Sequence, residues 1–396
     1  MNRYLLAGCA AVALAMGSGA ANAQAKFEVK VGGDVFAEWG WVDNDLDTGL
    51  RSTEMRNRFR FNLIPSAKAD NGLEYGARIR VRADSSNSGA ANNDTNVSRL
   101  LNQDRAYIFA QGGFGQVRVG TSNTYNDETI VSRPIDYLPF GLFDQFNGFA
   151  NTATNGLTGL SQSNNLGQGS ATWPTFGDVA TRIVYFSPRI AGFQLGASYT
   201  PRTDDSQNSV NRSEFASGIT AADTVTDSFQ DLLEVGANYD ATFGSVKVKV
   251  GAGYYWGDAS DVAGANYRDM RAWQAGAQVG FAGATIGASY TDWGKSGTRR
   301  SAVDFGDRAN VWNVGAQYTV GPIVVGGGWM FAKDSGEVTL PGKREINVYE
   351  IGASYTVAPG FAVQAQYDYF DIENETGRTA FDDKGSVVIL RTTLAF

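Results

Sequence analysis

The sequence predicts an all-β fold, a closed antiparallel transmembrane β-barrel of sixteen strands. Three observations lead to this prediction. Apolar and polar residues alternate in successive segments of about ten residues, an N-terminal segment has the form of a secretory signal peptide, and no later apolar run is long enough for a transmembrane helix. An exported chain without such a helix can still cross a membrane as a barrel, because each strand's backbone groups pair with its neighbours.

The composition excludes several other kinds of protein. The 396 residues contain no histidine and one cysteine, Cys9, so a Ser–His–Asp triad, a His-paired thiol and a His-ligated metal site are all excluded. A net charge of −8 argues against nucleic-acid binding, which needs a basic surface. We therefore expect no enzyme, no cofactor, no metal site and no nucleic-acid partner. The 48 glycines and the 12% aromatic content favour many strands joined by tight turns.

Residues 1–23 are predicted to be a cleaved signal peptide, leaving one barrel domain over residues 24–396. Arg3 provides the positive charge, an apolar stretch runs from residue 4 to residue 16, and Ala21-Asn22-Ala23 is a small-residue cleavage site. An alternative is a lipoprotein signal, since residues 6–9 (LAGC) resemble a lipobox. The apolar stretch continues well past Cys9, which favours the first interpretation.

Each strand is predicted from alternation with a period of two. In the first, Val29, Val31 and Val35 share one face, and Lys30 and Asp34 share the other. The last has the same pattern over residues 388–396. Fourteen more strands are predicted to start near Glu54, Leu73, Asp104, Gly115, Thr181, Gly192, Asp231, Ser245, Met270, Ala284, Arg308, Pro322, Ile346 and Gly360.

A short motif, Gly-Ala-x-Tyr, recurs within these strands. It occurs at residues 196–199, 236–239, 251–254, 287–290, 315–318 and 352–355. Its spacing follows the strands and not a fixed period, so it is a strand-level repeat and does not indicate a solenoid.

The connections between strands alternate between short and long, as in bacterial outer-membrane barrels. The short ones are predicted at residues 65–72, 112–114, 188–191, 242–244, 282–283, 321 and 358–359, which puts both termini at the short-turn, periplasmic end; the long ones are extracellular. Aromatic residues near both strand ends, such as Tyr199, Tyr290 and Tyr318, fit two membrane interfaces. A soluble sandwich or propeller is the alternative, but it would require polar outer faces.

Two internal motifs and the last residue resemble those of the Gram-negative general porins. Residues 105–120 (RAYIFAQGGFGQVRVG) are similar to the porin hairpin that ends in Gly-x-Phe-Gly, and residues 185–199 (YFSPRIAGFQLGASY) to the porin Ser-Pro turn. The resemblance implies a homotrimer in the outer-membrane lipid, and a third long loop, residues 121–180, that folds into the barrel and narrows it. It also implies that Phe396 is the signal read by the barrel-assembly machinery.

A row of arginines is predicted to face the interior. Strand two carries Arg56, Arg58 and Arg60, strand three carries Arg78, Arg80 and Arg82, and all six lie on the polar face. If the hairpin pairs Pro65 with Leu73, then Arg60 opposes Arg78, Arg58 opposes Arg80 and Arg56 opposes Arg82. Like charges in one ladder require water, counter-ions or acidic neighbours, and Glu54 and Glu74 are candidates for the last role.

The family resemblance adds one arginine to the predicted basic wall, and at a second family position this sequence has no arginine. Arg105 matches a family position on the basic wall of the constriction. The usual arginine before the Ser-Pro motif is Asp178 here, with Arg182 as a possible substitute. The alternative interpretation is that these arginines are ordinary solvated polarity of the interior.

The opposing negative charge is predicted to come from the third long loop. This loop contains Asp127, Glu128, Asp136 and Asp144, and residues 138–144 (LPFGLFD) resemble a family segment, with Asp144 and then Asp136 as the expected acidic rim. A basic wall facing acidic groups would create a transverse field that orients dipolar solutes. The alternative is that these are solvated loop carboxylates.

The predicted function is passive diffusion of ions and small hydrophilic solutes through a water-filled outer-membrane channel. A channel specific for a sugar or an anion is the alternative; it would need aromatic contacts such as Tyr107, Phe109 or the loop phenylalanines. A third class is an adhesion or structural barrel, in which the inward arginines would have no role. Calcium between loop carboxylates is possible, but no ligand spacing requires it.

Overall fold

A computed structural model of the chain describes residues 26–46, 49, 51–87, 97–138, 149, 180–203, 229–259, 267–297, 300, 308–336, 341–374 and 382–396. The predicted signal peptide, Asp144 and Asp178 lie outside these residues.

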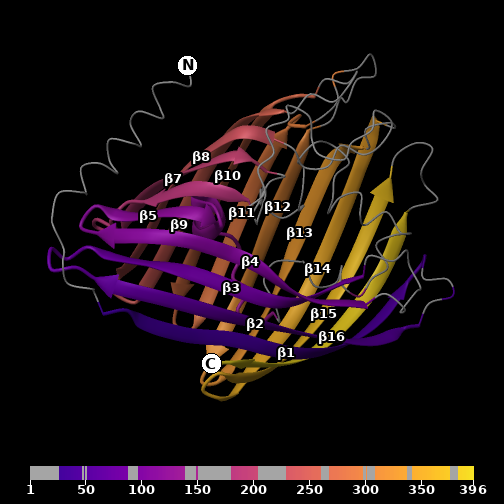
Figure 1. Cartoon of the computed structure of the whole chain (residues 1–396). Helices are drawn as coiled ribbons and strands as arrows, with labels where there is room; N and C mark the ends of the chain where they lie inside the picture. Colours follow the sequence, from indigo (N-terminus) through magenta and orange to yellow (C-terminus); the bar gives the residue numbers. More distant parts are fainter. Residues whose placement is uncertain are drawn as a thin grey trace.

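Sixteen antiparallel strands in the described part of the chain form one closed barrel, as predicted (Figure 1). Each strand pairs with its neighbours in sequence, and β1 pairs with β16 to close the ring. The strands are β1 (Glu28–Asn44), β2 (Thr53–Lys68), β3 (Glu74–Asn87), β4 (Val97–Gly112), β5 (Gly115–Thr121), β6 (Thr181–Phe186), β7 (Phe193–Arg202), β8 (Phe229–Phe243), β9 (Val246–Ala259), β10 (Met270–Phe281), β11 (Ala284–Gly294), β12 (Ala309–Val320), β13 (Ile323–Gly336), β14 (Pro341–Ala358), β15 (Phe361–Asn374) and β16 (Asp383–Ala395).

The alternation in sequence becomes an apolar outer face and, on β2, a polar inner face. Elsewhere the inner face also carries apolar residues, such as Val348, Phe370 and Ile389, in a buried cluster that packs against Ile135 of the third long loop. On β2, Phe59 and Phe61 lie outward and are each 38% exposed, while Arg58 and Arg60 between them point inward and form ion pairs. Successive side chains of a strand point to opposite faces. This arrangement also fits the membrane environment, because a charge on the lipid face would cost roughly 2–4 kcal/mol at mid-depth.

The outer face carries aromatic residues near the strand ends. At the long-connection end of β10–β12, the ring of Tyr290 lies 5.2 Å from Trp273 and 4.4 Å from Trp312, centre to centre. At the short-turn end, Phe193 and Tyr239 are 4.4 Å apart. These clusters have the positions expected of two interfacial aromatic rings.

The short turns are tight because their residues adopt left-handed backbone angles. Between β10 and β11 the turn consists of Ala282 and Gly283, with φ of 49° and 85°. Two consecutive positive φ values are the pattern of the type I′ turn, whose twist matches that of the strands it joins.

Two strands begin earlier than the sequence predicts. β4 starts at Val97 and not near Asp104, and β14 starts at Pro341 and not near Ile346. In both, the backbone ladder continues beyond the alternating segment: β3 and β4 still pair at Asn87–Val97. Outside the apolar band, strands need hydrogen bonds but no apolar face, so the periodicity does not reveal these extensions.

The predicted register of the β2–β3 hairpin is wrong. The prediction opposes Arg60 to Arg78, Arg58 to Arg80 and Arg56 to Arg82; the structure pairs Arg60 with Arg82 and Asn62 with Arg80. The turn occupies residues 69–73 because β2 continues through Pro65 to Lys68. Proline usually marks a strand end, but here the ladder passes from Leu63–Ile79 to Ser66–Gly76 without pairing residue 65.

One short helix, α2 (Tyr125–Thr129), opens the third long loop and lies inside the barrel, where it contacts β6–β9 (Figure 1). Among the described residues, no helix has the length and apolarity needed to cross a membrane.

The opposite orientation of neighbouring residues on β2 can be tested with single cysteines, since the only native cysteine is Cys9. In lipid vesicles, Arg58→Cys is expected to react with a charged, membrane-impermeant thiol reagent about tenfold or more faster than Phe59→Cys, because only the inward thiol meets water and ionises. Equal rates at the two positions would contradict the assigned faces.

Candidate functional site

The inner face of β1–β4 is a wall of arginines interleaved with three carboxylates. Arg60 Nε lies 2.7 Å from Asp34 Oδ1, and Arg58 Nη2 lies 3.4 Å from Asp34 Oδ2. Arg56 forms an ion pair with the buried Glu38, whose other oxygen is 3.7 Å from Arg391 Nε of β16. The side chains of Arg56 and Arg60 each remain 31% exposed, so they present positive charge to the interior.

The third carboxylate, Asp104, serves the arginines of β3. It accepts both hydrogen bonds of the Arg80 fork, at 2.7 and 2.6 Å, and lies 3.6 Å from Arg82. Two parallel bonds of this kind fix the guanidinium in orientation as well as in position. Arg78 differs, since its guanidinium bonds the amide oxygen of Asn62 at 3.1 and 2.9 Å.

The acidic neighbours of the arginines are therefore not the ones expected. Glu54 lies 4.0 Å from Arg51 in an exposed pair, and Glu74 stands opposite Lys68 on the neighbouring strand. The partners Asp34 and Glu38 lie directly opposite Arg60 and Arg56 on β1. Opposite charges in directly opposed positions stabilise a sheet, which explains how this wall tolerates so many arginines.

Arg105 faces inward but is buried at 3% exposure. A β-bulge interrupts the β3–β4 ladder between Arg80 and Val81, opposite Gln103–Arg105. The extra residue of the bulge puts Asp104 and Arg105 on the same face. Arg105 donates a hydrogen bond to Asn123 Oδ1, just after β5, and so holds the start of the third long loop.

Arg118 and Arg391 were not among the predicted site residues, although both side chains face inward on the strands next to this wall. Arg118 of β5 lies between the rings of Tyr107 and Phe186, at 5.2 and 4.4 Å, and Arg391 lies 3.9 Å from the ring of Phe36. Both occupy the polar face of an alternating strand, so the period-two pattern contains the signal that locates them. Arg182, the possible substitute on β6, is 2% exposed and opposes Gly120.

The first acids of the third long loop lie on α2. Thr124 caps the helix by accepting a hydrogen bond from the Asp127 amide at 3.1 Å, and the Asp127 carboxylate bonds Asn123. Glu128 reaches β5, where it pairs with Arg118 at 2.6 Å. The helix thus connects the loop to the basic side of the barrel.

Asp136 lies further along the loop, on the opposite side of the interior. Its amide donates to Gln317 Oε1 of β12 at 2.9 Å, and its carboxylate accepts from Gln317 Nε2 at 2.7 Å. The residue remains exposed to the interior. Strand order in the closed ring separates β12 from the arginines of β2 and β3, so Asp136 is the described loop acid placed to oppose them.

A buried ion pair holds the loop between these two acids. Arg133 pairs with Glu350 of β14, and both side chains are 0% exposed. The Tyr137 hydroxyl donates to Glu350 Oε1 at 2.8 Å and accepts from Arg133 Nη1 at 3.1 Å. Burial raises the pKa of the Tyr137 phenol, so this hydroxyl stays protonated and available as a donor.

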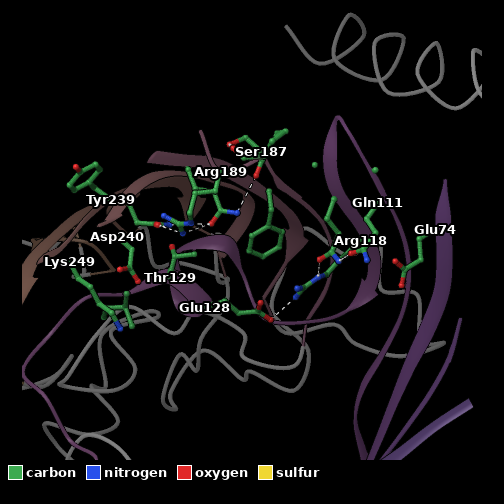
Figure 2. A pocket seen from close by; sticks show the side chains of 18 of the residues that line it. Glu74, Gln111, Arg118, Glu128, Thr129, Ser187, Arg189, Tyr239, Asp240 and Lys249 are labelled. Atoms are coloured by element: carbon green, nitrogen blue, oxygen red, sulfur yellow. Dashed lines mark hydrogen bonds and ion pairs between the residues drawn. The ribbon is translucent and has the colours of Figure 1, made fainter. Parts of the chain in front are cut away.

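Beside α2, on the side of the short turns, the interior opens into a vestibule of about 740 Å³ (Figure 2). Side chains of both charges line it, among them Lys68, Arg118, Arg189 and Lys249 with Glu74, Glu128 and Asp240. Arg189 bonds Asn238 Oδ1 at 2.5 Å and Gln194 Oε1 at 3.2 Å. A space of this size with a charged and amide-rich lining suits hydrated solutes.

The closed sixteen-strand barrel, with its charged interior and a loop inside it, agrees with the family to which the sequence is similar. The model of the Gram-negative porin family matches residues 10–375. The chain belongs to the Gram-negative porin family. Its location is therefore the outer membrane, and its general function is that of an outer-membrane porin channel.

Solved porin structures share the fold at low sequence identity. A loop-deletion mutant of OmpT, an outer membrane protein of Vibrio cholerae, has a TM-score of 0.59 and 14% identity, over 93% of this chain and 99% of that one. A triple mutant of the porin from Rhodopseudomonas blastica has a TM-score of 0.56 and 16% identity, over 93% and 100%. No curated protein matches the sequence.

The buried pair that anchors the loop is expected to be important for stability. Arg133→Met leaves Glu350 buried without its guanidinium, which should lower the free energy of unfolding by about 3–5 kcal/mol. Urea titration in lipid vesicles measures this. The control is Arg51→Met, which removes an exposed pair with Glu54 and should change the value by less than about 1 kcal/mol. Equal losses in the two variants would show that the buried pair is unimportant.

Proposed function

We propose that this porin is a water-filled channel for passive diffusion of ions and small hydrophilic solutes. The observation that carries the proposal is the row of partly exposed guanidinium groups on the inner face of β2 and β3, with Arg56, Arg60 and Arg82 each about one-third exposed. Arginines at strict period two, facing a lumen, require water around them. Ion pairing with Asp34, Glu38 and Asp104 neutralises only part of their charge.

We also propose a transverse electric field across the narrowest part of the channel, with the third long loop as its negative side. Asp136 lies on the wall opposite the arginines and remains exposed, and Asp144 is proposed to extend this acidic rim. Such a field orders water and orients dipolar solutes, which favours polar over apolar passage. Asp127 and Glu128, which bond Asn123 and Arg118, are proposed to contribute to the constriction from the basic side.

A solute-specific channel remains the alternative, but the described aromatic residues do not favour it. Tyr107 and Phe109 are each 8% exposed, and Arg118 covers the Tyr107 ring. Rings covered in this way pack the wall and offer no continuous stacking surface to a sugar. The family and the fold likewise favour a channel over an enzyme.

We also propose a homotrimer and an assembly role for Phe396. The trimer is supported by the family and by in-vitro folded OmpT of Vibrio cholerae in its trimer form, which shares the fold at a TM-score of 0.57 and 13% identity, over 93% of this chain and 99% of that one. Phe396 keeps a 64% exposed side chain at the seam between β1 and β16, where assembly machinery would have access to it.

Charge neutralisation on the arginine wall tests the channel mechanism. The triple variant Arg58→Gln, Arg60→Gln, Arg80→Gln removes three positive charges from the lumen. The reversal potential in a salt gradient across a planar bilayer is therefore expected to shift towards cation selectivity.

The matched control is Lys384→Gln, which removes a positive charge that pairs with Asp371 on the outward parity of β16. It should leave the reversal potential unchanged. If the triple variant keeps wild-type selectivity, the arginine wall has no part in permeation.

A further inference from the structure

The Gly-Ala-x-Tyr repeat lies on strands outside the arginine wall. Alternation puts its Ala and Tyr on the outer face, where Tyr199, Tyr254, Tyr318 and Tyr355 are exposed. Its Gly and x residues therefore face inward. Glycine weakens a strand because it contributes no side-chain packing, and it often marks a place where another backbone approaches closely.

What approaches the repeat is the third long loop. On β7, Gly196 faces the ring of Tyr125, and Ser198 Oγ accepts a hydrogen bond from the Tyr125 amide at 2.7 Å. On β8, the Asn238 amide donates to the Tyr125 hydroxyl at 2.8 Å. Tyr125 of the loop is thus contacted by inward-facing Gly and x residues of two neighbouring repeats, on β7 and β8.

The same arrangement continues strand by strand as the loop advances. On β11, Gly287 lies beneath the Ser132 carbonyl, and the Ser289 hydroxyl is 2.7 Å from the Ser132 hydroxyl. On β12, Gln317 bonds both the amide and the carboxylate of Asp136. On β14, Gly352 lies against the ring and carbonyl of Tyr137.

The structure also uncovers a degenerate copy of the repeat. Residues 276–279 of β10 read Gly-Ala-Gln-Val, without the outer tyrosine. Gly276 faces the Val131 carbonyl, and Gln278 Nε2 donates to the Ser132 carbonyl at 2.6 Å. β10 thus keeps the inward Gly and x residues of the motif although it lacks the outward tyrosine. Contact with the loop is therefore the feature that these strands share.

We propose that the inward Gly and x residues of the repeat form a seat that fixes how far the third loop projects into the bore, and thereby set the size limit of the channel. The inference rests on the proposed channel function. The glycines allow the loop to lie directly on the wall, and the x side chains of β7, β8, β11 and β12 bond it there. A bulkier residue in the seat would lift the loop into the lumen and narrow the passage.

Gly276 offers the sharpest test, because a Cβ there would lie 1.8 Å from the Val131 carbonyl oxygen. This is backbone, which has to move inward before an ordinary contact is restored. Gly276→Ala is therefore expected to reduce single-channel conductance by about a factor of two, since conductance follows the narrowest cross-section. It should also lower the largest sugar that enters vesicles in a swelling assay.

Gly280→Ala is the matched control, on the same face of the same strand. A Cβ at Gly280 meets its nearest atom, Thr285 Oγ1, at 3.4 Å, which is an ordinary contact, and the next two atoms belong to Ala284 and Lys247 of the wall. It should conduct like the wild type. Heat-modifiable mobility on gels reports whether each barrel has closed, and Gly287→Ala, whose Cβ would lie 2.8 Å from the Ser132 carbonyl oxygen, is the second variant if Gly276→Ala does not fold.

The outcomes separate the seat from the channel itself. If the wild type conducts and a folded Gly276→Ala or Gly287→Ala barrel has the same conductance and size limit, the seat does not set the aperture. If the control falls as far as Gly276→Ala, the effect belongs to the strand and not to the loop. If the wild type inserts without conducting, the proposed function fails, whatever the seat does.

Discussion

The requirement that every strand find a partner on both sides determines the rest of this structure. In a lipid environment an unpaired backbone amide or carbonyl costs several kcal/mol, so the sheet closes between β1 and β16. Closure creates an inside and an outside, and the period of two assigns each residue to one of them. The apolar outer face, the charged interior and the room for a loop all follow from this division.

The interior then has to accommodate charges of one sign gathered on neighbouring strands. It does so with few carboxylates, each placed between two guanidinium groups: Asp34 between Arg58 and Arg60, and Asp104 beside Arg80 and Arg82. Such sharing holds the arginines in fixed positions and leaves a positive surplus facing water. The loop binds the other side of the ring through its own buried pair, Arg133 with Glu350.

Much of the fold was predictable from sequence because its main signal is local and is repeated in every strand. The strand count, the faces of Arg58 and Phe59 and the alternation of turns and loops all depend on neighbouring residues. Register was not predictable at the β2–β3 hairpin, where Pro65 resembles a strand end yet lies within a strand. Glu54 and Glu74 were predicted as acidic partners because they share the face of the arginines, whereas the partners Asp34 and Glu38 come from the neighbouring strand β1.

The site depends on contacts between distant residues, which the periodicity does not contain. The bulge that turns both Asp104 and Arg105 inward leaves no clear mark in the sequence. The repeat can be recognised in the sequence, but its contacts cannot. They are made with Tyr125, Ser132 and Asp136 of the third loop, which is distant from the repeat in sequence. Arg118 and Arg391, in contrast, could have been predicted from the sequence. Both lie on the polar face of an alternating strand, but the predicted arginines were taken mainly from strands two and three.

The seam also has a consequence for biogenesis. Gly33 and Phe396 exchange two backbone hydrogen bonds, of 2.9 and 3.0 Å, so the seam joins the first strand to the end of the last one. The cylinder is incomplete until β16 has been synthesised and has paired with β1. Before that pairing forms, the polypeptide has two unpaired strand edges, and a product that lacks β16 would keep two such edges open.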